Sequence, residues 1–451
     1  MNQLAVAKFG GTSMSNMKTM STCADIVLSR PEVKIVVVSA TSGTTNLLIR
    51  ISQSALNNDW ETTDELIQSL IGNHNKIHEN IGYKKSVNEK LISVFEEIRT
   101  LAKGMYYLKE ISPKAYDSLL GTGEILSSIL FSEVLNQISE KKNVKVFDAR
   151  DVMITNNKFG SAEPDISSIK AKADELLLPI IEENIVVTQG FVGRTKKGEN
   201  TVLGRGGSDY SATLLAEAVE ASEVQIWTDV SGVASSDPRF VENARWINEI
   251  SYSEAAELAN SGAKVLHPQT LIPAIRNAIP VFVGNSFNPT DSGTWIKGDA
   301  DKKPLIRAIA LKRNQMILTI SSIKMIDAYG FLENIFRVFS SHKLSIDLIT
   351  TSEASISVTI DEPELLTDEA IEDLEKYADV TVENSLSLVT IVGNGILTTP
   401  GIAAKTFSSI NGNNIRMICY GASRHNFGFL VDDKDGETIV KKLHKVFLEA
   451  E

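Results

Sequence analysis

The sequence is poor in cysteine, has no long apolar run and carries no excess of positive charge. Its 451 residues include two cysteines, Cys23 and Cys419, which lie far apart without a CxxC spacing, so neither a disulfide framework nor a cysteine zinc site is indicated. The N-terminus lacks a basic region with a cleavage motif, and no run approaches the roughly 18 apolar residues of a membrane span. We therefore expect a cytoplasmic protein with free thiols.

The charge balance and two missing signatures exclude further classes of protein. The net charge is -12 at pH 7, whereas a nucleic acid or an anionic membrane surface favours a basic binding face, so we expect neither partner. Neither GxxxxGK(S/T) nor a GxGxxG after a strand occurs, so neither a P-loop nor a dinucleotide site is predicted. The composition, 43% hydrophobic and 23% charged, is that of a globular protein.

Short β-branched runs alternate with longer helical stretches through the first two thirds of the chain. Most of the runs are apolar on both faces, as in parallel strands that helices cover. The pattern predicts an α/β layered fold with a mostly parallel sheet, in which functional residues gather at the carboxyl ends of the strands. The expected strands are 4–9, 33–40, 144–149, 184–191, 224–230 and 279–285, and the expected helices include 61–110, 122–141, 165–182, 208–220 and 253–260.

The last third of the chain contains an internal repeat. Residues 285–304 are rich in Asn, Asp, Ser, Gly and Pro, which indicates the approach to a domain boundary. Beyond them, the segment that starts at Gly330 aligns without a gap with the segment that starts at Gly401, an offset of 71 residues. Each copy reads as a helix after the glycine, then a strand, a turn and a strand. Two small α+β units predict a regulatory module, with a purely dimerising role as the alternative.

Lys8 interrupts an apolar strand, and Gly10 and Gly11 follow it at once. Glycines after a strand let backbone N–H groups approach an anion and the ammonium adds charge, which suits a polyphosphate; a tight turn is the alternative. A second glycine cluster, GRGGSD, precedes an expected helix N-terminus, another anion site. Because its Asp209 would repel phosphate, we expect it to hold two cations in place, Lys8 and Lys264.

Other polar residues have a structural and a functional interpretation side by side. In LLGTGEILSS, Glu124 follows Gly-Thr-Gly at an expected helix start, as an ordinary first-turn acid or as a receiver of a substrate ammonium. Ser39 and Thr45 belong to a hydroxyl-rich segment after a buried strand, which forms a turn or lines a small polar substrate. Lys264 taken alone is an exposed lysine after a helix, and His267 before a proline is structural.

Six motifs in this order, KFGGTS, VVSATSGTTN, GTGE, GRGGSD, WTDVSG…SSDPR and SGAKVLHP, resemble those of the aspartate kinases in the amino-acid kinase family. The tail, GFLENIF…LSIDLITTSE followed by IRMICYGAS, resembles the paired ACT domains of the monofunctional, lysine-sensitive kind. The resemblance covers essentially the whole chain. It implies a three-layer αβα kinase domain with a mostly parallel central sheet at 1–295, and two α+β ferredoxin-like ACT domains at 305–390 and 391–451.

The resemblance also implies an activity, phosphoryl transfer from ATP with Mg²⁺ to the side-chain carboxylate of L-aspartate, the first step toward lysine, threonine and methionine. That carboxylate has a pKa of about 3.9 and needs no general base. A kinase for glutamate or a nucleotide and a catalytically silent sensor are the alternatives. The implied nucleotide contacts are Lys8, Gly10, Gly11, Thr228, Asp229, Arg239 and Lys264, with Asp209 organising Lys8; the implied aspartate contacts are Ser39, Thr45, Glu124 for the ammonium and Arg205 for the α-carboxylate. No protein metal site is expected.

Two positions depart from the family pattern. Ala234 stands where the family commonly has an aromatic residue near the nucleotide base, and Ala328 stands where lysine-sensitive relatives often have a hydroxyl residue. Lysine is the expected effector, with threonine as the alternative. Because ACT units pair across subunits, we expect a homodimer or a tetramer made of two dimers. The effector residues that the resemblance implies are Met325, Phe331, Leu332, Ser345, Ile346, Asp347, which would pair with an ammonium, and Glu353.

Overall fold

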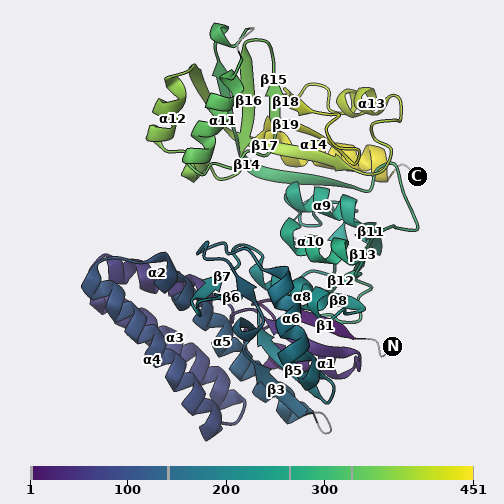
Figure 1. Cartoon of the computed structure of the whole chain (residues 1–451). Coiled ribbons are helices and arrows are strands. Elements are labelled where there is room, and N and C mark those ends of the chain that lie inside the picture. The colour runs from purple at the N-terminus through teal and green to yellow at the C-terminus, as the bar shows by residue number, and fades with distance from the viewer. Residues whose placement is uncertain (1–3, 140–142, 264–265, 327–328, 450–451) are drawn as a thin grey trace. The chain divides into compact units, whose positions relative to one another are not determined.

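The computed structural model describes residues 4–139, 143–263, 266–326 and 329–449. The chain forms two compact units, and the second takes in two stretches from the middle of the sequence (Figure 1). The first unit comprises Met1–Val233, Asn248–Tyr252 and Val265–Ala300, and the second comprises Ala234–Ile247, Ser253–Lys264 and Asp301–Glu451.

The first unit is built on an eight-stranded sheet. Its strand order is β11 (Glu249–Ser251), β13 (Thr294–Lys297), β12 (Val281–Asn285), β8 (Glu223–Thr228), β1 (Ala5–Phe9), β2 (Val33–Val38), β5 (Asn184–Gln189) and β3 (Asn143–Phe147). All neighbours pair in parallel except β12 and β13. The predicted α/β class with a mostly parallel sheet is confirmed. Composition gave no sign of β13, which lies inside the polar segment 285–304.

The helices of the first unit form two groups that both contact the sheet. One group is α1 (Met17–Leu28), α2 (Thr44–Leu56), α3 (Trp60–Asn80), α4 (Lys85–Leu108) and α5 (Pro113–Ile138); the other is α6 (Ile166–Lys172), α7 (Leu178–Ile181), α8 (Gly207–Ala218) and α10 (Pro268–Arg276). The single helix expected over 61–110 is wrong. The chain breaks between α3 and α4, where Gly82 has a left-handed φ of 87°.

Helix α5 is a core element. Among the described residues it is the one helix long and apolar enough to cross a membrane, but 83% of that apolar window is buried inside the protein. It contacts β2, β3 and β5, whereas α8 contacts β1, β2 and β8. A small sheet of β4 (Ile154–Thr155), β6 (Val192–Thr195) and β7 (Asn200–Val202) and a short pair of β9 (Val233–Ala234) with β10 (Trp246–Ile247) complete the strands outside the repeats.

The second unit contains both repeat copies in one antiparallel sheet. Its order is β15 (Ile349–Thr351), β16 (Ser355–Ile360), β14 (Ala308–Ser321), β17 (Asp379–Val392), β19 (Asn426–Asp432) and β18 (Met417–Cys419). In each copy a helix begins directly after the predicted glycine, and two strands follow. The helices are α11 (Phe331–Ser341) and α12 (Asp368–Glu375) in the first copy, α13 (Ile402–Ser409) and α14 (Asp433–Leu448) in the second, and α9 (Tyr252–Asn260).

The two long strands β14 and β17 are shared between the copies. Asn314 and Ser385, which are 71 residues apart, both have a left-handed φ, 57° and 61°, and the β14–β17 register shifts beside Asn314. On one side of this irregularity Ile309 of β14 packs in the core of the second copy; on the other side Val380 of β17 packs against the core of the first. Each copy therefore completes its core with half a strand from the other.

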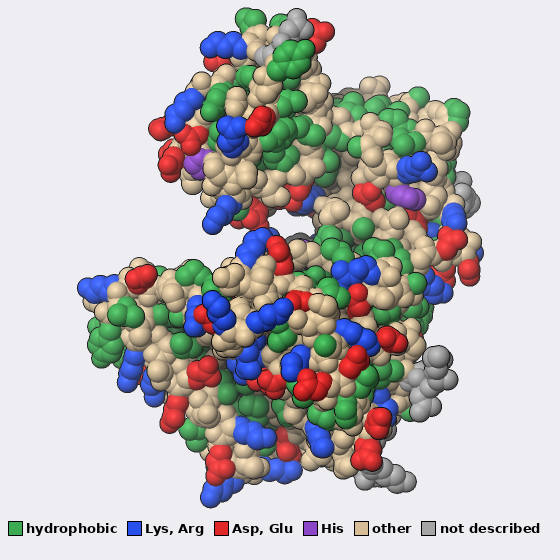
Figure 2. Space-filling view, viewed as in Figure 1, with side chains coloured by type: hydrophobic (Ala, Val, Ile, Leu, Met, Phe, Trp, Pro, Cys, Tyr) green, Lys and Arg blue, Asp and Glu red, His purple; other side chains and the backbone are tan. Residues whose placement is uncertain are grey.

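Charged side chains of both signs are interspersed on the molecular surface. On the face shown in Figure 2, Lys and Arg side chains lie among Asp and Glu side chains on both units. On that face the acidic side chains do not gather in one patch.

Candidate active site

The loops that follow β1, β2, β8 and β12 are tied together at one edge of the sheet. The Ser39 N–H donates to the carbonyl of Phe9 at 3.1 Å, and the Gly10 N–H donates to the carbonyl of Trp227 at 3.2 Å. The Ser286 N–H donates to the carbonyl of Thr228 at 2.8 Å. Since parallel strands end at the same edge, these bonds extend the sheet into a rim on which polar side chains collect.

Lys8 and Asp209 form an ion pair at this rim. Lys8 lies in a strand whose residues are all buried, and Asp209 lies in the first turn of α8; their side chains are 10% and 16% exposed. A side chain at Gly10 would lie 3.8 Å from the Lys8 Nζ, so the missing side chain leaves the ammonium open on that side. The structure thus brings together three of the predicted residues, Lys8, Gly10 and Asp209, and Asp209 holds the Lys8 ammonium in place.

The expectation that Glu124 begins a helix is wrong. Helix α5 starts at Pro113, where the Ser112 side chain accepts from the Ala115 N–H, and Glu124 lies in the middle of the helix. The glycines of GTGE serve close packing instead. A Cβ at Gly123 would lie 3.0 Å from the Ala40 Cβ, and one at Gly121 would lie 2.9 Å from a Val192 methyl. They let α5 carry Glu124 up against the loop that follows β2.

The Glu124 carboxyl group is buried and only partly satisfied. It is 4% exposed, accepts a hydrogen bond from the Ala40 N–H and has one oxygen, Oε2, without a hydrogen-bond partner. Burial raises its pKa to about 8, although that backbone bond and the positive charge of Lys8 act in the opposite direction. A buried acid beside a cation and short of one donor fits a ligand that brings an ammonium.

The hydroxyl-rich segment after β2 divides into two sets. Thr41 is buried and bonded to Thr44 (Oγ1 to Oγ1, 2.6 Å) and to His74 Nε2 at 3.1 Å, so these side chains hold the loop. Burial lowers the pKa of His74, which keeps the imidazole neutral. Ser39 and Thr45 are only partly buried and remain accessible. No local sequence signal points to His74, which comes from α3.

The GRGGSD loop is shaped by close contacts at its glycines. Gly206 has a left-handed φ of 68°, and a Cβ there would lie 2.4 Å from the Cβ of His267. His267 also caps α10, where its Nδ1 accepts from the Gln269 N–H at 3.4 Å. Both contacts give His267 a structural role, whereas the Arg205 side chain is exposed and close enough to His267 to help lower its pKa, after burial as the main cause.

The predicted nucleotide residues are brought together only in part. The Thr228 hydroxyl donates to Asp229 at 3.2 Å, and Asp229 is exposed. Arg239 lies in the second unit, where its guanidinium pairs with Asp237. Lys264 lies outside the described residues. Two buried serines to which the sequence analysis gave no role, Ser13 and Ser286 (Oγ to Oγ, 2.7 Å), tie the glycine loop to the end of β12. Ser13 is the last residue of the KFGGTS motif.

The predicted effector residues surround the start of α11 and the strand β15. Asp347 pairs with the Nζ of Lys312 at 2.9 Å, and Lys312 also pairs with Asp361. Met325, Phe331 and Ile346 contribute to the core of the first copy, while Leu332, Ser345 and Glu353 are exposed. Ala328 lies outside the described residues.

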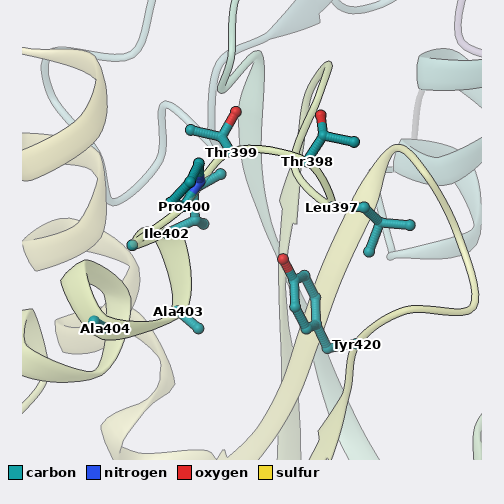
Figure 3. A pocket seen from close by; sticks show the side chains of 9 residues that line it. Leu397, Thr398, Thr399, Pro400, Ile402, Ala403, Ala404 and Tyr420 are labelled. Carbon is teal, nitrogen blue, oxygen red and sulfur yellow. The ribbon is translucent and has the colours of Figure 1, made fainter.

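The second copy has a hollow at the corresponding place. A cavity of about 390 Å³ borders the start of α13, and its lining residues include Leu397, Pro400, Ile402 and Tyr420 (Figure 3). These are the counterparts, 71 residues on, of residues around the start of α11 and in β15. The lining carries hydroxyl groups from threonine and tyrosine but no charged side chain.

Comparison with known proteins agrees with this architecture. The model of the amino acid kinase family matches residues 3–285, and that of an ACT domain matches residues 318–376 and 389–447. The lysine-sensitive aspartokinase 3 of Escherichia coli (strain K12) is 43% identical over 456 residues, covering all of both chains.

Two solved structures of the E. coli enzyme are similar over nearly the whole chain, both at 43% identity. That of aspartokinase III with aspartate and ADP (R-state) has a TM-score of 0.90 and covers 98% of this chain and 99% of that one. That with lysine and aspartate (T-state) has a TM-score of 0.84 and covers 99% of both. An amino acid kinase fold followed by two ACT domains defines the class. Within it, the chain belongs to the aspartokinases.

Proposed function

We propose that the chain transfers the γ-phosphoryl group of ATP to the side-chain carboxylate of L-aspartate and forms 4-phospho-L-aspartate, and that the residues at the rim of the first unit do so in the roles below. One observation carries the assignment of roles: the buried Lys8–Asp209 pair stands within electrostatic range of a carboxyl group, Glu124, that lacks one donor. Membership of the aspartokinases and the relative solved with aspartate and ADP support it.

The chemistry needs alignment and neutralisation of charge rather than a base. The aspartate carboxylate is ionised at pH 7 and attacks directly. Lys8, held by Asp209, would lie against the transferring phosphoryl group and Lys264 would add a second cation, since the negative charge is spread over the phosphoryl oxygens in the transition state. Thr228 and Asp229 would serve the nucleotide at this rim, whereas Arg239 belongs to the second unit and pairs with Asp237 there.

The substrate aspartate would be oriented at both of its other groups. Glu124 would accept its ammonium through the unpartnered Oε2, and Arg205 would take the α-carboxylate in a forked pair. Ser39 and Thr45 would line the side chain. Fixing both ends places the attacking carboxylate in line with the phosphorus, which is how positioning lowers the barrier.

The surroundings of Lys8 suit the phosphates of a nucleotide. The glycine side of Lys8 is open to an anion, and among the described residues no group of three or more His, Cys, Asp and Glu side chains could hold a metal ion. Mg²⁺ brought by ATP supplies charge neutralisation between the phosphates when it is bound. The part of this chain is to receive that complex on Lys8, Gly10 and Gly11.

Binding of aspartate should release a proton from Glu124. A carboxyl group with a pKa of about 8 is mostly protonated at pH 7, and an arriving ammonium stabilises the ionised form, so aspartate binding should release most of one proton at pH 7 and progressively less as the pH rises through 8. Calorimetry in two buffers of different ionisation enthalpy measures the number. Asp117→Asn is the matched control and should release the same number of protons as the parent. Asp117 is a buried acid of the same helix with a raised pKa, but it accepts hydrogen bonds from the Gly160 and Val202 N–H groups. Tight binding without proton release at pH 7 would remove Glu124 from the ammonium site.

We propose L-lysine as the effector, bound at the first repeat copy, in a homodimer or tetramer located in the cytoplasm. The E. coli relative solved with lysine and aspartate supports the effector, and the thiols of Cys23 and Cys419 are free, as a reducing compartment requires.

Replacing Asp347 by alanine should strongly weaken inhibition by lysine, because the effector would lose its acidic partner. The concentration of lysine that halves turnover should rise by at least about tenfold, while the variant still turns over without lysine. Rates with and without lysine measure the effect. Asp379→Ala, an acid at the start of β17, is the control and should be inhibited like the parent. Unchanged inhibition of Asp347→Ala would move the effector site elsewhere.

A further inference from the structure

The first repeat copy contains a cluster of two acids and one base beside the proposed effector site. The Lys312 Nζ lies 2.9 Å from Asp347 Oδ2 and also contacts Asp361. The side chains of Lys312, Asp347 and Asp361 are 20%, 31% and 29% exposed, so water screens these charges only in part. The acid assigned to the ammonium of the effector is thus already occupied by an ammonium of the chain itself.

The cluster has one negative charge too many. Two carboxylates share a single ammonium, and the Oδ1 of Asp361 is buried without a hydrogen-bond partner. Burial and the neighbouring Asp361 raise the pKa of Asp347 to about 6, although Lys312 acts against this. A second ammonium would balance the cluster, with one cation for each carboxylate.

The second copy shows that the cluster is no general feature of the fold. At an offset of 71 residues, Lys312 corresponds to Glu383 and Asp347 to Ile418. In the second copy Glu383 of β17 pairs with Arg416. The two-acid, one-base arrangement is therefore specific to the copy that carries the proposed effector residues.

We propose that Lys312 is an internal stand-in for the ammonium of the effector. Without effector it bridges Asp347 and Asp361; when lysine binds, the arriving ammonium takes Asp347, and Lys312 remains on Asp361. The inference rests on the proposed effector site. Lys312 therefore competes with the effector for Asp347 and sets the lysine concentration at which inhibition begins. Asp361 favours the exchange, because it offers Lys312 a partner when the effector takes Asp347.

Two substitutions separate competition from mere support of the site. Lys312→Met removes the competitor, so the lysine concentration that halves turnover should fall about 2- to 5-fold, as expected for loss of a partly exposed ion pair. Asp361→Asn leaves Lys312 with Asp347 alone, so that concentration should rise by a similar factor. If Lys312 only held Asp347 in place, Lys312→Met would instead weaken inhibition.

The experiment measures inhibition curves on the full-length protein, each relative to the rate of that variant without lysine. Lys434→Met, which removes an exposed lysine of the same unit, controls for net charge. Lys312→Gln replaces Lys312→Met if thermal unfolding shows that the methionine variant is not folded. Opposite shifts for the two variants support the proposal; an unchanged or raised value for Lys312→Met overturns it. A parent protein that neither binds lysine in calorimetry nor is inhibited by it would instead contradict the effector assignment.

Discussion

Replacing Lys8 by alanine should lower kcat by about 100- to 1000-fold, the usual effect of removing one donor to the transition state. The ammonium stands at the open side of Gly10 and is held by Asp209, so no other described side chain of β1 can replace it. Steady-state assays with saturating ATP and aspartate measure the change. A loss of only a few fold would mean that Lys8 does not contact the reacting phosphoryl group.

Stability must be separated from catalysis in this variant. Removing one partner of a buried ion pair leaves the other charge uncompensated and costs about 3–5 kcal/mol. The double variant Lys8→Ala with Asp209→Asn removes that unpaired charge, so it should recover unfolding stability but not turnover. Lys18→Ala, at an exposed lysine of α1, should be active and stable. Recovery of turnover in the double variant would show that Lys8 acts only on the fold.

Replacing Glu124 by glutamine should raise the KM for aspartate by roughly 30-fold or more, the effect of truncating one partner of a buried charged pair. The amide keeps the shape of the side chain and can still accept from the Ala40 N–H. It loses the negative charge that the substrate ammonium needs. The KM for ATP should change far less, because the proposed role of Glu124 is to bind the ammonium of aspartate.

The ratio of the two effects is the decisive quantity. Varying each substrate at saturating levels of the other gives both KM values for the variant and for Glu133→Gln, an α5 acid that pairs with Lys84 away from the rim. Equal changes in both KM values for Glu124→Gln would contradict an aspartate-binding role. A change in the control of the same size would point to a disturbed helix.

Sequence reading predicted the sheet and the pairing of Lys8 with Asp209 at its rim. An ammonium in an apolar strand is costly unless a partner and a ligand explain it, and this reasoning led to Lys8 and Asp209, which the structure pairs. The repeat was equally visible, because helix starts after Gly330 and Gly401 and the strand pattern recur at one offset.

Long-range packing was not predictable from local patterns. The glycines of GTGE indicated a helix start, whereas Gly121 and Gly123 lie inside α5. They are needed there because Val192 and Ala40 pack directly against the helix backbone. The buried bond between Thr41 and His74 joins residues that no motif connects. The exchange of half strands between the repeat copies depends on the pairing of β14 with β17. The sequence of a strand alone does not indicate which other strand it pairs with.

Trapping the acyl phosphate with hydroxylamine tests the central claim most directly. With MgATP and saturating aspartate the protein should form aspartyl hydroxamate, and glutamate in place of aspartate should give little. Added lysine should suppress the signal more than threonine does. Formation of hydroxamate from glutamate but not from aspartate, or none from either amino acid, would contradict the assignment of phosphoryl transfer to aspartate at this rim.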